Sequence, residues 1–201
     1  MTQPRLALAL LTGAALLSSA CGPVRSHWVR DDYAQVDRAA TLRLRVVVEA
    51  PAEATAPEEI WEMWALIARR YANQKRDFIV SEHGAAEGAF DLAAACEEGY
   101  EGILRLEPTL TLVGAGAEAT LKASLLRCHD GAPVWRAEAG GTWPQQDPVL
   151  EATVQEYVEE YDEGVRPYVA PVFHLSKAAL DTLPKPTLPP EAVDEKIDAE
   201  L

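Results

Sequence analysis

An amphipathic stripe in residues 55–76 is the feature that most restricts the fold. Its apolar side chains recur at helical spacing, at Ile60, Trp64, Ile67 and Tyr71, widened by Trp61 and Ala68. Residues three and four apart lie on one side of a helix, so these side chains form one apolar face that needs a partner. A sheet in the same chain is the usual partner, and an aromatic ligand site or a membrane-binding face is the alternative interpretation.

Strand patterns surround this helix. The stretch "TLRLRVVVEA" alternates and then becomes wholly apolar, which is typical of a strand that enters a core, and "RDFIVSE" predicts a second strand. A loop and a short helix in "GAAEGAFDLAAACEEGY" come next. Residues 101–143 then predict antiparallel strands, with "HDG" in a hairpin turn, and two helices follow from Asp147 onward. This order predicts an α+β fold: a mixed, largely antiparallel sheet packed with helices on one side, in a single domain.

The N-terminus has the layout of a secretory signal. One basic residue precedes an apolar run of about a dozen residues, and Ser18, Ser19 and Ala20 precede Cys21. A helix that crosses a bilayer needs roughly 20 apolar residues, so this run does not predict a permanent membrane span. We therefore expect residues 1–20 to be a signal peptide.

Cys21 is the predicted lipidation site. Small residues precede it and Gly22 follows it, as in bacterial lipoproteins, although the leucine usual at the third position before the cysteine is one place early, at Leu17. Acyl chains such as palmitate on Cys21 predict an anchor in the outer membrane, on its periplasmic side. A secreted soluble protein with a free N-terminal cysteine is the alternative.

The two remaining cysteines form an even pair once Cys21 carries lipid. An exported protein keeps disulfides, so we predict a bond between Cys96 and Cys128. It closes a loop of about thirty residues and is worth roughly 3 to 4 kcal/mol on a chain-entropy argument. Two buried thiols are the alternative.

Charge and length limit the possible partners. The chain has 201 residues and a net charge of −14, and loss of Arg5 with the signal makes it more negative. Phosphate backbones repel such a protein, so we expect no nucleic-acid partner. The length suits one domain with tails, and we expect a lipidated tether at 21–40, the domain at 41–183, and a Pro-rich acidic tail at 184–201.

No residue pattern predicts catalysis, a metal or a cofactor. The four histidines are scattered, at His27, His83, His129 and His174. A metal site from Cys128-His129 with Glu82-His83 is disfavoured because neighbouring residues of a strand point to opposite faces. The stretch "GAGAE" at 114–118 lacks the lysine of a phosphate loop and suits a hairpin turn better. The Glu-Glu pairs fall on predicted solvent faces, so we expect no enzyme activity.

Two stretches carry a resemblance to known envelope proteins. "GYEGILRLEPTLTL" and "DGAPVWRAEAGGTW" resemble the small α/β domain of the TolB N-terminal region, the curli-secretion lipoprotein and the lipoprotein activators of penicillin-binding proteins. Asp130, Gly131 and Trp135 give a shortened form of the hairpin motif of that group. The N-terminus, the cysteine pair and the C-terminal "PYVAPVF" to "DAEL" segment are similar to an uncharacterised family of bacterial outer-membrane lipoproteins. The resemblance implies a fold and a location, and it assigns no activity.

The sequence thus favours a non-catalytic cell-envelope lipoprotein that acts as an interaction or assembly subunit. Its predicted contact surfaces are an exposed sheet edge, by strand addition, and the tail from Pro184 onward. The alternative is a subunit of an oligomeric outer-membrane secretion channel, since a homo-oligomer is compatible with the same resemblance.

Overall fold

The computed structural model describes residues 22–53, 56–86, 88–96 and 99–200. Cys21 and the predicted signal lie outside the described residues. The strands are β1 (Val24–Val29), β2 (Arg43–Val48), β3 (Ile79–Ala85), β4 (Gly102–Val113), β5 (Gly116–Arg127) and β6 (Pro133–Pro144). The helices are α1 (Tyr33–Val36), α2 (Glu58–Arg76), α3 (Leu92–Ala95), α4 (Glu151–Glu160), α5 (Arg166–Leu180) and α6 (Val193–Glu200), with 3₁₀ turns at Glu163–Val165 and Pro190–Ala192.

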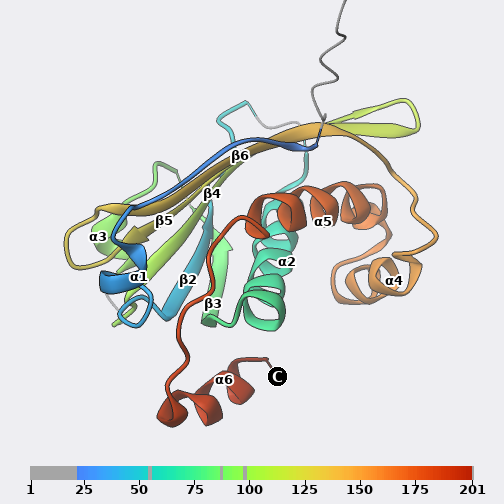
Figure 1. Ribbon diagram of the computed structural model, residues 1–201. Coiled ribbons are helices and arrows are strands. Elements are labelled where there is room, and N and C mark those ends of the chain that lie inside the picture. Colours follow the sequence, from blue (N-terminus) through green and yellow to red (C-terminus); the bar gives the residue numbers. More distant parts are fainter. Residues whose placement is uncertain (1–21, 54–55, 87, 97–98, 201) are drawn as a thin grey trace, which may run out of the picture.

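The six strands form one sheet in the order β1-β6-β5-β4-β2-β3 (Figure 1). β2 runs parallel to both β3 and β4, whereas the pairs β4–β5, β5–β6 and β6–β1 are antiparallel. Helix α2 connects the parallel strands β2 and β3. Tight turns connect β4 to β5 and β5 to β6, whereas β1 and β6 are distant in the chain. The predicted mixed, largely antiparallel sheet is therefore confirmed.

Helices α2 and α5 cover one face of the sheet (Figure 1). The predicted apolar stripe of α2 lies in this interface, where Trp64 is fully buried and Tyr71 is only 8% exposed. Trp135 of β6 is also fully buried, and its indole nitrogen donates a hydrogen bond to Thr182. The stripe is thus core, and the alternative of an aromatic ligand or membrane face is wrong.

The opposite face is covered only at one corner. The loop that contains α3 packs Phe90, Leu92 and Ala95 against Val47 and Ile103, whose side chains point away from α2. Elsewhere this face is polar, because the outward positions of β4, β5 and β6 are mainly Thr, Ser, Glu, Lys and Arg.

The predicted tether at residues 21–40 differs from the structure. Residues 24–29 form β1, which pairs with β6 from Val24↔Ala139 to Val29↔Trp135, and Tyr33 of α1 is buried. The segment is short of apolar periodicity because an edge strand with both faces partly in solvent needs none.

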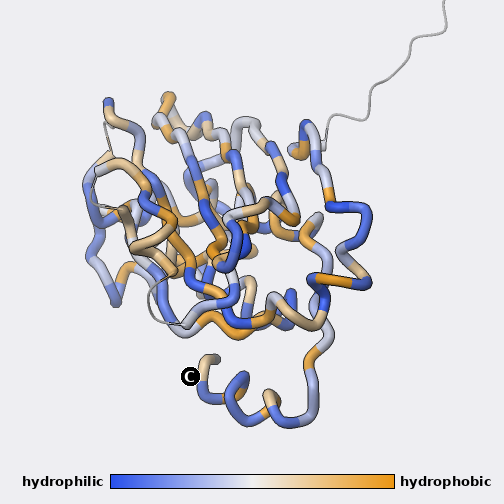
Figure 2. The backbone as a smooth tube through the Cα atoms, turned by 90° about the vertical axis from the view of Figure 1, so that its left-hand side faces the viewer, coloured by the Kyte–Doolittle hydropathy of each residue, from blue (hydrophilic) through white to orange (hydrophobic). Residues whose placement is uncertain are grey.

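The predicted extended tail also differs from the structure. The segment that begins at residue 184 contains α6, which contacts α2 and β3. Figure 2 shows that hydrophilic residues dominate this helix. Ala192 is fully buried against Leu42 and Ile79, and Arg43 forms an ion pair with Glu195 at 2.7 Å. Further hydrogen bonds hold the segment, because Lys196 donates to the Phe78 carbonyl and the side chains of Arg69 and Asn73 donate to the carbonyl of Ala199. Together these contacts fix a segment whose composition suggested a linker.

Candidate interaction site

β1 ends the sheet on one side, and most of its residues are exposed. Hydrogen bonds join Arg30 N–H to the Val134 carbonyl at 3.0 Å and Gly140 N–H to the Pro23 carbonyl at 2.8 Å. Backbone groups alternate in direction along a strand, so the N–H and C=O groups of His27 and Val29 point away from β6. β1 is the last strand of the sheet on this side. Among the described residues no strand pairs with its outer side, so β1 presents free pairing groups to another extended chain.

Two side chains of β1 flank this edge on the polar face of the sheet. Trp28 is 44% exposed, and the guanidinium carbon of Arg136 lies 5.9 Å from the centre of its ring. The guanidinium of Arg25 lies across Gly140, where an added side chain would meet it at 2.7 Å. The edge thus combines an accessible aromatic ring with two cations.

The other edge of the sheet, β3, is occupied by side chains of α2. The buried Asn73 accepts a hydrogen bond from Val80 N–H at 2.7 Å and donates one to the Val80 carbonyl at 3.0 Å. Glu62 accepts a hydrogen bond from Ala85 N–H at 2.8 Å. These side chains take the positions that a seventh strand would need at both ends of β3.

A buried ion pair holds the segment that links β1 to β2. The guanidinium of Arg127 bonds the fully buried Asp37 carboxylate at 3.1 Å, and it also bonds Asp130. The Ala132 N–H and the Arg127 guanidinium lower the pKa of Asp130 below its usual value. Because Asp37 directly follows α1, this pair fixes the path of the chain after β1.

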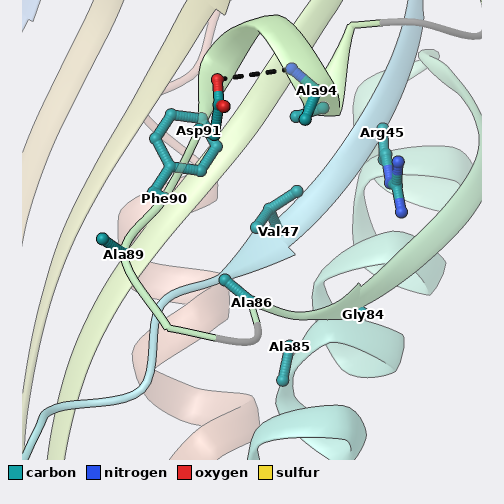
Figure 3. Close-up of a pocket in the computed structure, with 10 residues that line it drawn as sticks. Arg45, Val47, Gly84, Ala85, Ala86, Ala89, Phe90, Asp91 and Ala94 are labelled. Atoms are coloured by element: carbon teal, nitrogen blue, oxygen red, sulfur yellow. Dashed lines mark hydrogen bonds between the residues drawn. The ribbon is translucent and has the colours of Figure 1, made fainter.

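A shallow pocket of about 370 Å³ lies beside the α3 loop (Figure 3). Small side chains and Val47 line much of it, together with Arg45, Phe90 and Asp91. The Asp91 carboxylate accepts hydrogen bonds from the N–H groups of Ala93 and Ala94, so it caps α3. Phe90 stacks on Arg105, whose guanidinium carbon lies 4.8 Å from the ring centre. Asp91 and Phe90 thus already have structural partners within the domain, and Arg45 forms a longer ion pair with Glu82 at 3.8 Å.

The disulfide between Cys96 and Cys128 is present, and it joins the α3 loop to the turn after β5. The two sulfur atoms close the small apolar corner under Val47 and Ile103. The lipidation site, Cys21, lies outside the described residues, so its modification stays a prediction.

The other predicted positions lie apart from one another. The structure gives no group of three or more potential metal ligands among the described residues, and the His129 ring lies 3.5 Å from the carboxylate of the neighbouring Asp130. His174 of α5 bonds Asp147 at 2.8 Å, and the Val149 N–H together with His174 lowers the pKa of that carboxylate. "GAGAE" spans the β4–β5 turn, where Gly114 has a φ of +59°. The hairpin interpretation is therefore confirmed.

Sequence reasoning missed β1, Asn73 and the buried Arg127–Asp37 pair. "VRSHWV" contains three β-favouring residues between Pro23 and two aspartates, which is a recognisable signal for a short edge strand. No such signal exists for Asp37, because its partner Arg127 lies 90 residues away. Asn73 bonds Val80 only seven residues away, but across the turn between a helix and a strand, which the sequence pattern does not show.

No family model and no curated protein matches this chain. Among solved structures, a PelC variant dodecamer from Paraburkholderia phytofirmans is similar over 64% of this chain and 88% of its own, with 17% identity and a TM-score of 0.38. An uncharacterised lipoprotein B from Nitrosomonas europaea is similar over 74% and 96%, with 16% identity and a TM-score of 0.23. These distant similarities carry no argument about function.

Within the described part of the chain, no helix combines the length and apolar character that a bilayer span requires.

Proposed function

We propose that this protein is a non-catalytic cell-envelope lipoprotein, anchored through Cys21 in the outer membrane and facing the periplasm, that docks an extended segment of another envelope protein along β1. The open edge of β1 is the observation that carries this proposal. Strand addition uses main-chain hydrogen bonds for affinity and neighbouring side chains for selectivity. The backbone groups of His27 and Val29 would form the main-chain hydrogen bonds. The side chains of Trp28, Arg25 and Arg136 would provide the selectivity.

The chemistry of the partner follows from these side chains. An extended segment with an acidic residue placed near Arg25 or Arg136 would gain charge complementarity, and an apolar residue would pack on Trp28. The overall acidic charge of the chain restricts such attraction to this local cationic region.

A proline at position 27 tests the proposal. His27→Pro removes an N–H that points away from β6, so the β1–β6 ladder keeps its bonds while the outer edge loses a donor. His27→Thr is the matched control, because threonine keeps the N–H and favours strands. In-cell crosslinking of each lipidated variant, followed by mass spectrometry, measures which neighbours are captured.

We expect the control to recover the same envelope partner as the native chain and the proline variant to lose it. Recovery of that partner by both variants would contradict docking at β1. Crosslinks only between copies of this chain would favour the second candidate, a homo-oligomeric channel subunit built through the same edge.

A further inference from the structure

The β4–β5 hairpin tip lies at the end of the sheet where the proposed lipid anchor joins the domain (Figure 1). Val24, the first residue of β1, pairs with Ala139, and β6 continues from there to Pro144, which pairs with Gly116 beside the tip. At about 3.4 Å a residue, the sheet extends about 17 Å past the start of β1.

The chain between anchor and sheet is short. Cys21 precedes Val24 by three residues, and the Pro23 carbonyl is already bonded to Gly140 N–H. An extended chain spans at most about 3.6 Å a residue, so an acyl group on residue 21 starts within about 11 Å of Val24. The hairpin therefore reaches at least as far toward the bilayer as the anchored residue.

The tip has the composition of a membrane-contacting surface. Residues 109–117 and 139–146 contain no charged side chain, although the whole chain has 18 basic and 32 acidic residues. Val113 is 51% exposed at the tip. Trp143 lies on β6, the neighbour of β5, and is partly buried against the core. Tryptophan favours the interface between lipid and water.

Three backbone carbonyls of the turn already accept hydrogen bonds. The side-chain amide of Gln145 donates hydrogen bonds to the carbonyls of Gly114 and Gly116, each at 2.8 Å, and Gln145 N–H donates to the carbonyl of Ala115 at 3.1 Å. Unsatisfied carbonyls make insertion into an apolar medium costly. One glutamine thus removes much of that cost for this turn.

We infer that the tip of the β4–β5 hairpin, Val113 to Gly116, inserts into the interface of the bilayer that holds the anchor, so that the sheet stands with this end on the membrane. This inference rests on the lipidation in the proposed function. Its occupant is a phospholipid surface, because the short link from Cys21 places that surface next to the tip. In this orientation β1 starts about 17 Å from the tip and runs away from the membrane. Its free edge is then accessible from the periplasm.

A single-site label tests the inference in the full, lipidated chain. With Cys21 acylated and Cys96 bonded to Cys128, Ala115→Cys adds the one free thiol, which accepts an environment-sensitive fluorophore. Ala39→Cys is the matched control, since Ala39 is exposed and lies near the opposite end of the sheet. The purified protein is placed in vesicles of phosphatidylethanolamine and phosphatidylglycerol, with and without nitroxide-labelled acyl chains.

We expect nitroxide lipid to reduce the fluorescence at position 115 about twofold or more, as for a group about 5–10 Å into the interface, and to leave position 39 unchanged. Adding Val113→Glu should abolish the quenching at 115, whereas Val113→Leu should keep it.

Three outcomes overturn the inference. A label at 115 that is unquenched shows that the tip is outside the bilayer, and a blue-shifted but unquenched label shows that protein covers it. Equal quenching at 115 and 39 shows that the domain does not stand on this end. Mass analysis of the N-terminal peptide separates these results from failure of the proposed function, since a missing acyl group removes the anchor itself.

Discussion

The two edges of the sheet differ in whether the outward backbone groups of the edge strand are covered. β3 ends the sheet beside α2, where Asn73 and Glu62 bond its outward backbone groups and α6 lies alongside. β1 ends the sheet with no such cover among the described residues, and the outward groups of His27 and Val29 face solvent. An exposed edge is a pairing site for another chain, so proteins usually protect it. The protection of one edge only is what suggests that the other is used.

The difference also shows where stability resides. β3 is held by helix side chains on one side and by β2 on the other, whereas β1 depends on β6 and on the chain segment that follows it. Asp37, in that segment, forms an ion pair with Arg127 at the end of β5. Three substitutions test whether the two edges are secured by these particular contacts.

Arg127→Leu should lower the free energy of unfolding the most. It leaves the fully buried Asp37 carboxylate without its partner, and loss of one member of a buried ion pair costs about 3–5 kcal/mol of unfolding free energy. Urea denaturation measures the loss. Arg136→Leu, an exposed position on the neighbouring β6, is the control and should change the unfolding free energy by only about 0.5 kcal/mol. Similar losses in both variants would show that the Asp37 pair is not what holds this side.

Asn73→Ala should have the next largest effect, on the protected edge. The substitution leaves the Val80 N–H buried without the side chain that now bonds it, whereas the Val80 carbonyl keeps the Arg69 guanidinium. We expect a loss of about 1–3 kcal/mol of unfolding free energy. Chemical denaturation gives the loss, and size-exclusion chromatography detects any new pairing at β3. The neighbouring exposed Gln74→Ala is the control. An unchanged denaturation midpoint for Asn73→Ala would mean that α2 does not protect this edge.

Glu195→Gln should have the smallest effect. It removes the charge that pairs with Arg43 across the α6 contact, and exposed pairs are worth about 0–1 kcal/mol. We expect little change in global stability and faster proteolytic removal of the residues after Pro184. Asp194→Asn, at a neighbouring exposed position, should leave the cleavage rate unaltered. Equal rates in the two variants would indicate that the burial of Ala192 and the hydrogen bonds of Lys196 and Ala199 hold α6 without the ion pair.

Much of the fold followed from local patterns. The stripe of α2, the alternation in β5 at Leu121, Ala123 and Leu125, and the glycine turn between β4 and β5 each reflect a period or a turn residue within one segment. The cysteine count suggested the Cys96–Cys128 bond without any geometry. Local patterns did not predict β1 and α6 at the edges of the sheet. Both are short, polar segments whose own sequences favour no single structure.

Local patterns and the cysteine count thus predicted the α+β class, the buried face of α2 and the pairing of two cysteines, because periodicity and composition are properties of one segment or of a count. The packed domain alone shows which edge of the sheet is open, that Asn73 and Glu62 cover the other, and that the C-terminal residues pack on the domain. Those outcomes depend on hydrogen bonds and ion pairs between residues distant in the chain, such as Arg43 with Glu195 and Arg127 with Asp37. Their partners are chosen by the packed arrangement of the strands and helices.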